Sequence, residues 1–138
     1  MRRVRIDWRA VGVGASLAVL VTVPPAVLAR ALRGDDLEGQ ESNLWVVPVL
    51  ALFIGFGLGG HLAARRRPDA PLLHSAAAAL AAFVALCGFV VLRRLATGEG
   101  LSAPLVVTLA LLLQITVSLA VLGGYVAMRR EARGRRRA

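Results

Sequence analysis

Residues 44–92 read LWVVPVLALFIGFGLGGHLAARRRPDAPLLHSAAAALAAFVALCGFVVL. This stretch holds two apolar runs joined by a short basic turn at 65–71. Each run is near the roughly 20 residues that cross a hydrocarbon core of about 30 Å. One similar run precedes the stretch and another follows it. We therefore predict four transmembrane helices, at about 8–32, 44–64, 72–95 and 103–128.

The composition agrees with a membrane protein. Hydrophobic residues make up 57% of the 138 positions, above the roughly 45–50% that is typical of soluble domains. The four runs account for most of the chain and leave no room for a soluble domain. We predict one all-α transmembrane domain over residues 1–138, a four-helix bundle followed by a basic tail at 129–138.

The distribution of charge predicts the orientation of the bundle. All 17 basic residues are arginines, clustered mainly outside the apolar runs, which is typical of membrane flanks rather than of nucleic-acid binding. Four precede residue 10, three occupy 65–67 and six follow residue 128, whereas four lie on the opposite side, at 30, 33, 93 and 94. Both termini are therefore predicted to be cytoplasmic, with the arginines against anionic lipid headgroups.

The first apolar run also has features of a cleavable signal peptide. Arginines precede it, and Ala29-Arg30-Ala31 imitates a small-x-small cleavage site. The run from Ala10 to Leu28 is longer than the usual apolar region of about 7–15 residues, and Arg30 lies inside the site. These two features favour a retained helix.

Several residues mark the predicted helix ends. Asp7 is suited to cap the first helix, and Pro71 to occupy the first turn of the third. Gly34 and Gly98 can adopt the left-handed conformation that ends the first and third helices. Pro24-Pro25 remove two backbone donors, so we expect a bend in the first helix.

The sequence aligns with itself at a shift of 64 residues. Gly59-Gly60-x-x-Ala63-x-Arg65-Arg66 then matches Gly123-Gly124-x-x-Ala127-x-Arg129-Arg130, and Leu28, Arg30 and Gly34 match Leu92, Arg94 and Gly98. We interpret the chain as a duplicated helical hairpin. Its two copies are expected to insert in the same orientation, about a pseudo-two-fold axis along the membrane normal.

Small residues at four-residue spacing form a predicted packing stripe on every helix. Lipid gives helices no hydrophobic reason to associate, so close approach of backbones at small residues supplies the attraction. The predicted packing residues are Gly55, Gly59, Gly60, Ala63, Gly123, Gly124 and Ala127. We favour packing within one chain, and the alternative is a seam with a second copy or another membrane protein.

Three polar side chains within or beside the predicted helices are candidates for a functional role. His61 ends the second helix and His74 begins the third, so the two can face each other across the basic turn. Asp69 is the only acid nearby, whereas a structural zinc site usually takes four ligands, so interfacial or pH-responsive hydrogen bonding is favoured over metal binding. Gln114, near the middle of the fourth helix, is expected to point into the bundle and to bond another helix rather than to line a solute path.

The stretch Gly59-Gly60-His61-Leu62-Ala63-Ala64-Arg65-Arg66, followed by Pro68-Asp69-Ala70-Pro71-Leu72 and His74, resembles a family of small, uncharacterised bacterial four-helix membrane proteins. Members carry a Gly-Gly-x-x-Ala element, a short basic turn and then a His followed by a small residue. Here that pair is His74-Ser75, where the family pattern has His-Gly. The resemblance implies the four-helix fold and the bacterial cytoplasmic membrane, and it implies no activity.

No Ser-His-Asp set, pair of carboxylates, phosphate loop or metalloprotease motif can be assembled from the sequence. We therefore predict a protein that is not an enzyme and that has no cofactor and no metal. Our leading hypothesis is an assembly or accessory subunit that acts through helix packing. The alternative is a small channel or transporter formed by an oligomer.

Overall fold

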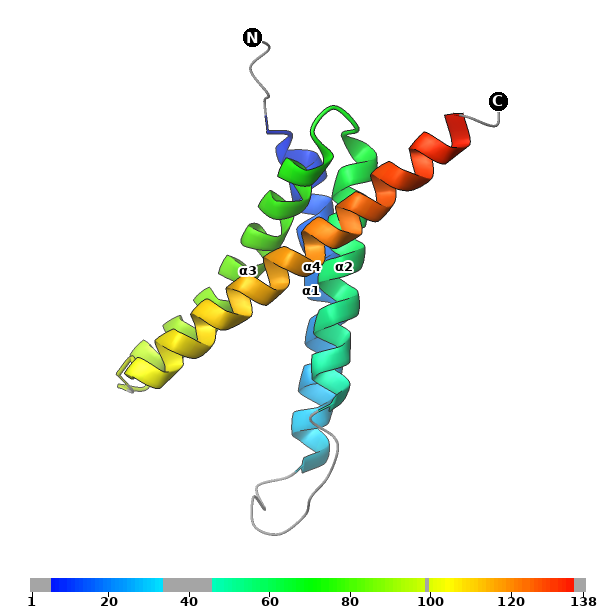
Figure 1. The fold of residues 1–138 in the computed structure, drawn as a ribbon. Helices are drawn as coiled ribbons and strands as arrows, with labels where there is room; N and C mark the ends of the chain where they lie inside the picture. Colours follow the sequence, from blue (N-terminus) through cyan, green and yellow to red (C-terminus); the bar gives the residue numbers. More distant parts are fainter. Residues whose placement is uncertain (1–5, 34–45, 99, 136–138) are drawn as a thin grey trace.

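The computed structural model describes residues 6–33, 46–98 and 100–135, and within these ranges the chain is all-α (Figure 1). The helices are α1 (Trp8–Arg33), α2 (Val46–Arg66), α3 (Pro71–Ala96) and α4 (Ala103–Arg135). Each is long and apolar enough to cross a membrane. The predicted class, a four-helix multi-pass membrane protein, is confirmed at this level.

The helix ends follow local backbone chemistry. Asp7 caps α1, because its Oδ1 accepts hydrogen bonds from the backbone N–H groups of Arg9 (2.9 Å) and Ala10 (3.4 Å). Pro71 opens α3, where a missing N–H costs nothing. Gly98 follows α3 with φ +74°, the predicted left-handed residue, whereas Gly34 lies outside the described residues.

One helix differs in extent from the predicted ones. α1 has its predicted range, as one helix from Trp8 to Arg33 with Pro24 and Pro25 inside it. α4 does not end near residue 128 but continues into the predicted tail, as far as Arg135. Arginine, alanine and glutamate are good helix formers, so the chain leaves the apolar region without leaving the helical conformation.

The four helices form a V (Figure 1). α1 and α2 lie side by side in one arm, and α3 and α4 form the other. The described starts of α1 and α3 and the last turns of α2 and α4 lie at the same end of the molecule, which we call the arginine-rich end. The two arms meet toward this end and diverge toward the opposite end. α2 packs on all three other helices, whereas among the described residues α1 and α4 do not pack on each other.

The core is built mainly from alanine and glycine. Among the described residues, Phe56 of α2 is the largest fully buried side chain, 1% exposed. It packs in one cluster with alanines of the three other helices, namely Ala18 of α1, Ala79 and Ala82 of α3 and Ala120 of α4. Small side chains let the helices approach closely around this one large ring.

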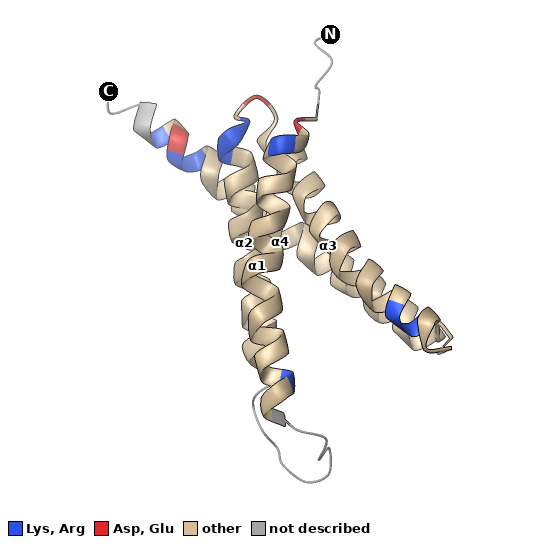
Figure 2. Ribbon diagram, turned by 180° about the vertical axis from the view of Figure 1, so that it is seen from behind, with Lys and Arg blue, Asp and Glu red and all other residues tan. Residues whose placement is uncertain are grey.

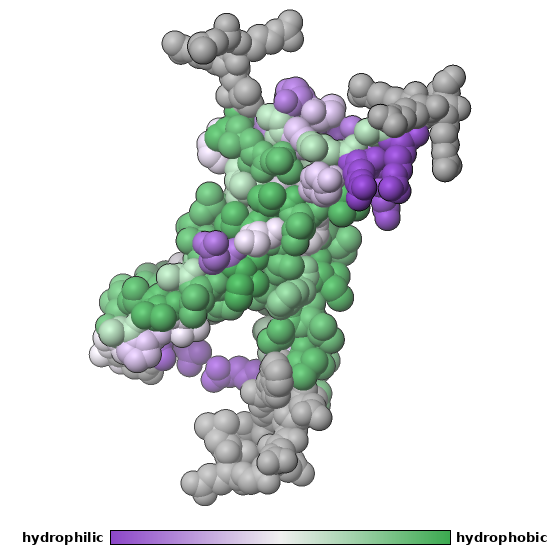
Figure 3. All heavy atoms as spheres, viewed as in Figure 1, coloured by the Kyte–Doolittle hydropathy of each residue, from purple (hydrophilic) through white to green (hydrophobic). Residues whose placement is uncertain are grey.

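Many large apolar side chains face outward, on all four helices. Examples are Leu20 of α1 (69% exposed), Ile54 of α2 (54%), Phe89 of α3 (71%) and Leu111 of α4 (61%). The visible face of the molecule is accordingly apolar over most of its described length (Figure 3). Arginines gather at the arginine-rich end, with a few at the far ends of α1 and α3 (Figure 2). This distribution suits a body embedded in lipid with polar ends.

Candidate helix-packing site and its polar cluster

α1 and α2 approach each other backbone to backbone. A Cβ atom at Gly59 would lie 2.5 Å from the carbonyl oxygen of Gly14, and one at Gly14 would lie 2.7 Å from the carbonyl oxygen of Gly59. One turn further along, a Cβ atom at Gly55 would lie 2.9 Å from the carbonyl oxygen of Ala18. Real Cβ atoms do not approach this closely, so the contact requires glycine on α2.

α2 and α4 cross at a second close contact. A Cβ atom at Gly60 would collide with backbone atoms of Ala120, and one at Gly123 would collide with the carbonyl oxygen of Gly57. Because the obstructing atoms belong to backbone, no side-chain rotation relieves the collision. This crossing joins the two arms of the V.

Ser75 extends the crossing to α3. Its hydroxyl is fully buried and lies within hydrogen-bond distance of the carbonyl oxygens of Gly60 (2.9 Å) and Pro71 (2.8 Å). A Cβ atom at Gly124 would collide with the same hydroxyl. Ala63 and Ala127, the other predicted packing residues, are buried at 0% and 2% exposure. All seven predicted packing residues therefore lie in contacts within the chain or beside them.

The two Gly-Gly pairs serve the same purpose in a different order. Gly59 faces α1, its partner in the first hairpin, and Gly60 faces α4. In the second hairpin Gly123 faces α2, whereas Gly124 faces α3. In each pair, one glycine contacts the other helix of the same arm and one contacts the other arm. The order is reversed, so Gly59 and Gly123, which the 64-residue shift aligns, do not make equivalent contacts.

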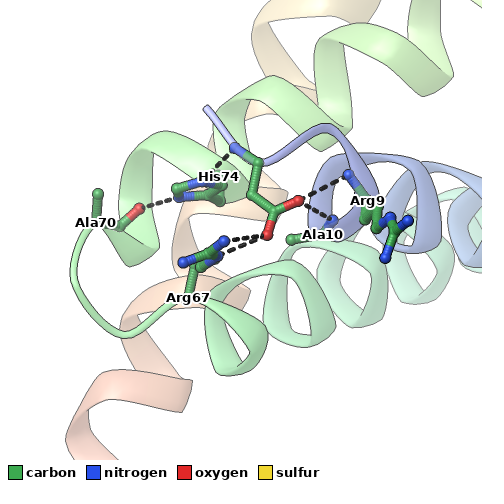
Figure 4. Close-up of polar contacts among 6 residues, drawn as sticks. Arg9, Ala10, Arg67, Ala70 and His74 are labelled. Carbon is green, nitrogen blue, oxygen red and sulfur yellow. Dashed lines mark hydrogen bonds and ion pairs between the residues drawn. The ribbon is translucent and has the colours of Figure 1, made fainter. Parts of the chain in front are cut away.

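A polar cluster joins the start of α1 to the turn before α3 (Figure 4). Arg67 donates from Nε to Oδ2 of Asp7 at 2.6 Å, and its Nη2 lies 2.6 Å from the same oxygen. The backbone N–H of Asp7 donates to Nε2 of His74 (3.1 Å), and Nδ1 of His74 lies 2.8 Å from the carbonyl oxygen of Ala70. The cluster thus ties α1, the α2–α3 turn and α3 together.

These contacts define the tautomer of His74. The ring is 1% exposed, and Nε2 must be an acceptor because the backbone N–H of Asp7 can only donate. The neutral ring then carries its proton on Nδ1, which donates to Ala70. His74 is a structural link between helices in this arrangement.

Asp7 is held in its charged form. The hydrogen bond from Arg67 is the largest cause of a lowered pKa, followed by the hydrogen bond from the backbone N–H of Arg9. Partial desolvation opposes the shift, without reversing it. The carboxylate therefore caps α1 and pairs with Arg67 at once, and both contacts favour ionisation.

The two histidines bond different partners. Nδ1 of His61 lies 3.2 Å from the carbonyl oxygen of Gly123, across the α2–α4 crossing, whereas His74 bonds Asp7 and Ala70. Each ring bridges neighbouring segments at the arginine-rich end, as an interfacial hydrogen-bonding residue does. No group of three His, Cys, Asp or Glu side chains suited to a metal ion occurs among the described residues.

Gln114 does not point into the bundle, and that expectation is wrong. Its side chain is exposed on the outer face of α4. Thr116 is the polar side chain of α4 that faces the core, at 1% exposure, with Oγ1 2.9 Å from the carbonyl oxygen of Leu112. Two residues along a helix turn the side chain by about 200°, so Gln114 and Thr116 face opposite sides.

Three features of the site were missed at the level of the sequence. Phe56 looked like any other apolar residue of its run, and the Asp7–Arg67 pair joins residues that no periodicity relates. Thr22 is the third, because its buried Oγ1 beside Gly55 has no hydrogen-bond partner. The glycine spacing of α2 is the signal that could have located Thr22. Gly55 belongs to the small-residue face of α2, and Thr22 lies on α1 directly opposite it.

Comparison of the chain with protein-family models, with curated proteins and with solved structures found no match.

Proposed function

We propose that this protein is a non-enzymatic integral membrane protein of the bacterial cytoplasmic membrane, acting as an assembly or accessory subunit through helix packing. The observation that carries the proposal is the unequal burial of the helices. α4 is the most apolar of the four spans, yet only 11% of its most apolar window is buried, against 33% for α2. A long outer surface on α4 is thus open to another helix.

The outer surface of α4 is not uniformly apolar, which favours protein over lipid as its neighbour. Gln114 is exposed on it, as are Thr108 and Ser118, whose hydroxyls bond within α4. A carboxamide such as that of Gln114 ordinarily faces other protein groups within a membrane span. Close packing inside the chain uses the opposite face of α4, where Thr116, Ala120 and Ala127 are buried.

We further propose that both termini are cytoplasmic. The first described turn of α1, the α2–α3 turn and the last turns of α4 share the arginine-rich end (Figure 2), and arginine is retained on the cytoplasmic side. Each arginine near an anionic headgroup contributes roughly 1 kcal/mol. Anionic lipid is therefore the expected partner of this end.

A photo-crosslinking residue at Leu111 tests the assembly role in native membranes, with the same residue at Phe89 of α3 as control. Both side chains are exposed, and both lie near the α3–α4 turn, so their depths are similar. We expect adducts with protein from Leu111, identified by mass spectrometry, and markedly fewer from Phe89. Adducts with lipid alone from Leu111 would contradict the proposal.

An oligomeric channel is the second candidate, and the outward Gln114 is the observation that favours it. Several copies arranged in a ring could place Gln114, Thr108 and Ser118 around a common path. Purified protein in liposomes tests this candidate. We expect no ion or solute flux, and reproducible flux that Gln114→Leu abolishes would instead establish the channel.

A further inference from the structure

We infer that the outer face of α4 binds a second copy of this chain, with Gln114 of one copy facing Gln114 of the other across a two-fold axis. The inference rests on the proposed assembly role and names the partner.

The outer face of α4 carries a stripe that we call the α4 stripe. It consists of exposed residues at spacings of three and four, namely Val107, Leu111, Gln114, Ser118, Leu122 and Tyr125. These steps average about 3.6 residues, one helical turn, so the stripe follows a single face of α4 along which another helix can pack. The buried residues Thr116, Ala120 and Ala127 lie on the opposite face of the helix, so the stripe is free to meet another molecule without disturbing the fold.

Gln114 and Tyr125 are the polar groups of the stripe whose side chains have no hydrogen-bond partner among the described residues. Tyr125 lies near the arginine-rich end, where headgroups can bond its hydroxyl, whereas Gln114 lies near the middle of the span. Ser118 donates to the backbone carbonyl oxygen of Gln114 at 2.8 Å, and nearby Thr108 donates to that of Pro104 at 2.9 Å, so both hydroxyls are satisfied within α4. The side-chain amide of Gln114 has no hydrogen-bond partner among the described residues. In hydrocarbon an amide without a partner is costly, because no water can replace the missing bonds.

A second copy supplies the missing partner more directly than another protein would. Copies of one chain insert in the same orientation, so Gln114 has the same depth in every molecule. A two-fold axis along the membrane normal then brings the two Gln114 side chains together. Each carboxamide has both donor N–H groups and an acceptor oxygen, so two of them can bond each other reciprocally. The small side chain of Ser118, one turn away, permits close approach.

Cysteine crosslinking in native membranes tests the geometry, with Cys87→Ser as background. Leu111→Cys lies on the stripe, and Ala110→Cys is the matched control because Ala110 is its chain neighbour and is also exposed. On oxidation we expect Leu111→Cys to give a product of twice the monomer mass, and Ala110→Cys at least about threefold less. Equal yields at the two positions would refute the stripe as the contact.

The association constant in lipid, measured by energy transfer between labelled copies, tests the chemistry. Gln114→Leu should lower it about threefold to thirtyfold, the range expected for interhelical hydrogen bonds in membranes. Gln114→Asn keeps the carboxamide and should retain part of the affinity. Thr108→Val should leave it unchanged, because the Thr108 hydroxyl is already bonded to Pro104. An unchanged constant in Gln114→Leu would overturn the inference even if dimers form.

The outcomes separate this inference from the proposed function. A crosslinked product of Leu111→Cys with a different protein, or a ladder of products beyond twice the monomer mass, overturns the two-fold pair and leaves the assembly role or the ring standing. A chain that stays monomeric in lipid and gives no protein adduct from α4 overturns both.

Discussion

Gly57 and Gly60 lie less than one turn apart on α2, yet an added methyl group has opposite consequences at the two positions. A Cβ atom at Gly60 would collide with the backbone of Ala120, whereas one at Gly57 would meet nothing within 4 Å. We expect Gly60→Ala to lower the free energy of unfolding by about 1–3 kcal/mol, the usual cost of overpacking. Gly57→Ala should be neutral or stabilising by up to about 1 kcal/mol, since alanine favours helix.

Thermal unfolding in detergent, followed by circular dichroism, measures both glycine variants. A midpoint for Gly60→Ala equal to that of the wild type would show that α2 and α4 do not meet there.

Asp7 gives a pH-dependent prediction. Arg67 is the first cause of its lowered pKa in the folded chain, so the carboxylate stabilises the fold at every pH above its ordinary value of 3.8. As the pH falls below that value and through the lower folded pKa, this contribution is lost. Asp7→Asn keeps a side chain that can cap α1 but removes the charge.

The wild type should therefore be more stable than Asp7→Asn at neutral pH, by a difference that stays constant down to about pH 4 and vanishes at lower pH. Unfolding midpoints across pH 2–7 measure this difference, and Asp7→Ala, which also loses the cap, should be less stable than Asp7→Asn throughout. A constant gap between wild type and Asp7→Asn at all pH values would exclude the ion pair as its source.

At the scale of the element, α2 combines a buried and an exposed phenylalanine. Phe56 is 1% exposed among alanines of α1, α3 and α4, whereas Phe53 is 44% exposed. Phe56→Ala leaves a cavity that rigid backbones cannot fill and should cost about 3–5 kcal/mol. Phe53→Ala should cost much less, because lipid fills the space. The free energy of unfolding of the two variants is compared in one detergent. Equal losses of stability would show that Phe56 is not a core residue.

The sequence largely predicted where each helix begins and ends. It did not predict which face of α4 is buried against the other helices. Length and apolarity locate a span because the bilayer demands both, and Asp7, Pro71 and Gly98 mark ends by local chemistry alone. In lipid, however, an apolar side chain is as stable on the lipid-facing surface as in the protein core. Hydropathy therefore does not show which face of α4 packs on the other helices. The small-residue face through Ala120 does orient it, and combining that face with helical geometry would have placed Gln114 outside.

At the scale of the whole molecule, the arginines and the fold together predict the topology. Asp69 lies in the turn before α3, and Thr97 directly follows α3, so the two are at opposite ends of one helix. With Cys87→Ser as background, we expect Thr97→Cys to react with an impermeant thiol reagent in intact cells, and Asp69→Cys to react only after lysis. The reverse pattern would mean that the arginine-rich end faces outward.

No feature of the sequence predicted that the two pairs of helices would form a V. Self-similarity at 64 residues suggests two like hairpins, but the depth at which the hairpins cross depends on individual contacts, such as that of Gly60 with Ala120. The shift aligns Gly59 with Gly123, but Gly59 contacts α1 within its own arm, whereas Gly123 contacts α2 of the other arm. Near-identical motifs therefore did not predict identical packing, because each backbone contact depends on the helix that lies opposite.

The diverging arms make the molecule responsive to the thickness of the bilayer. α2 has 21 residues, and α4 has 26 residues from Ala103 to Met128, before its terminal arginines. These lengths are about 32 and 39 Å at 1.5 Å per residue, so α4 tilts more than α2. A longer apolar helix matches a thin bilayer by tilting further. Since the arms are joined near one end only, a thinner membrane should widen the angle between them and a thicker one should narrow it.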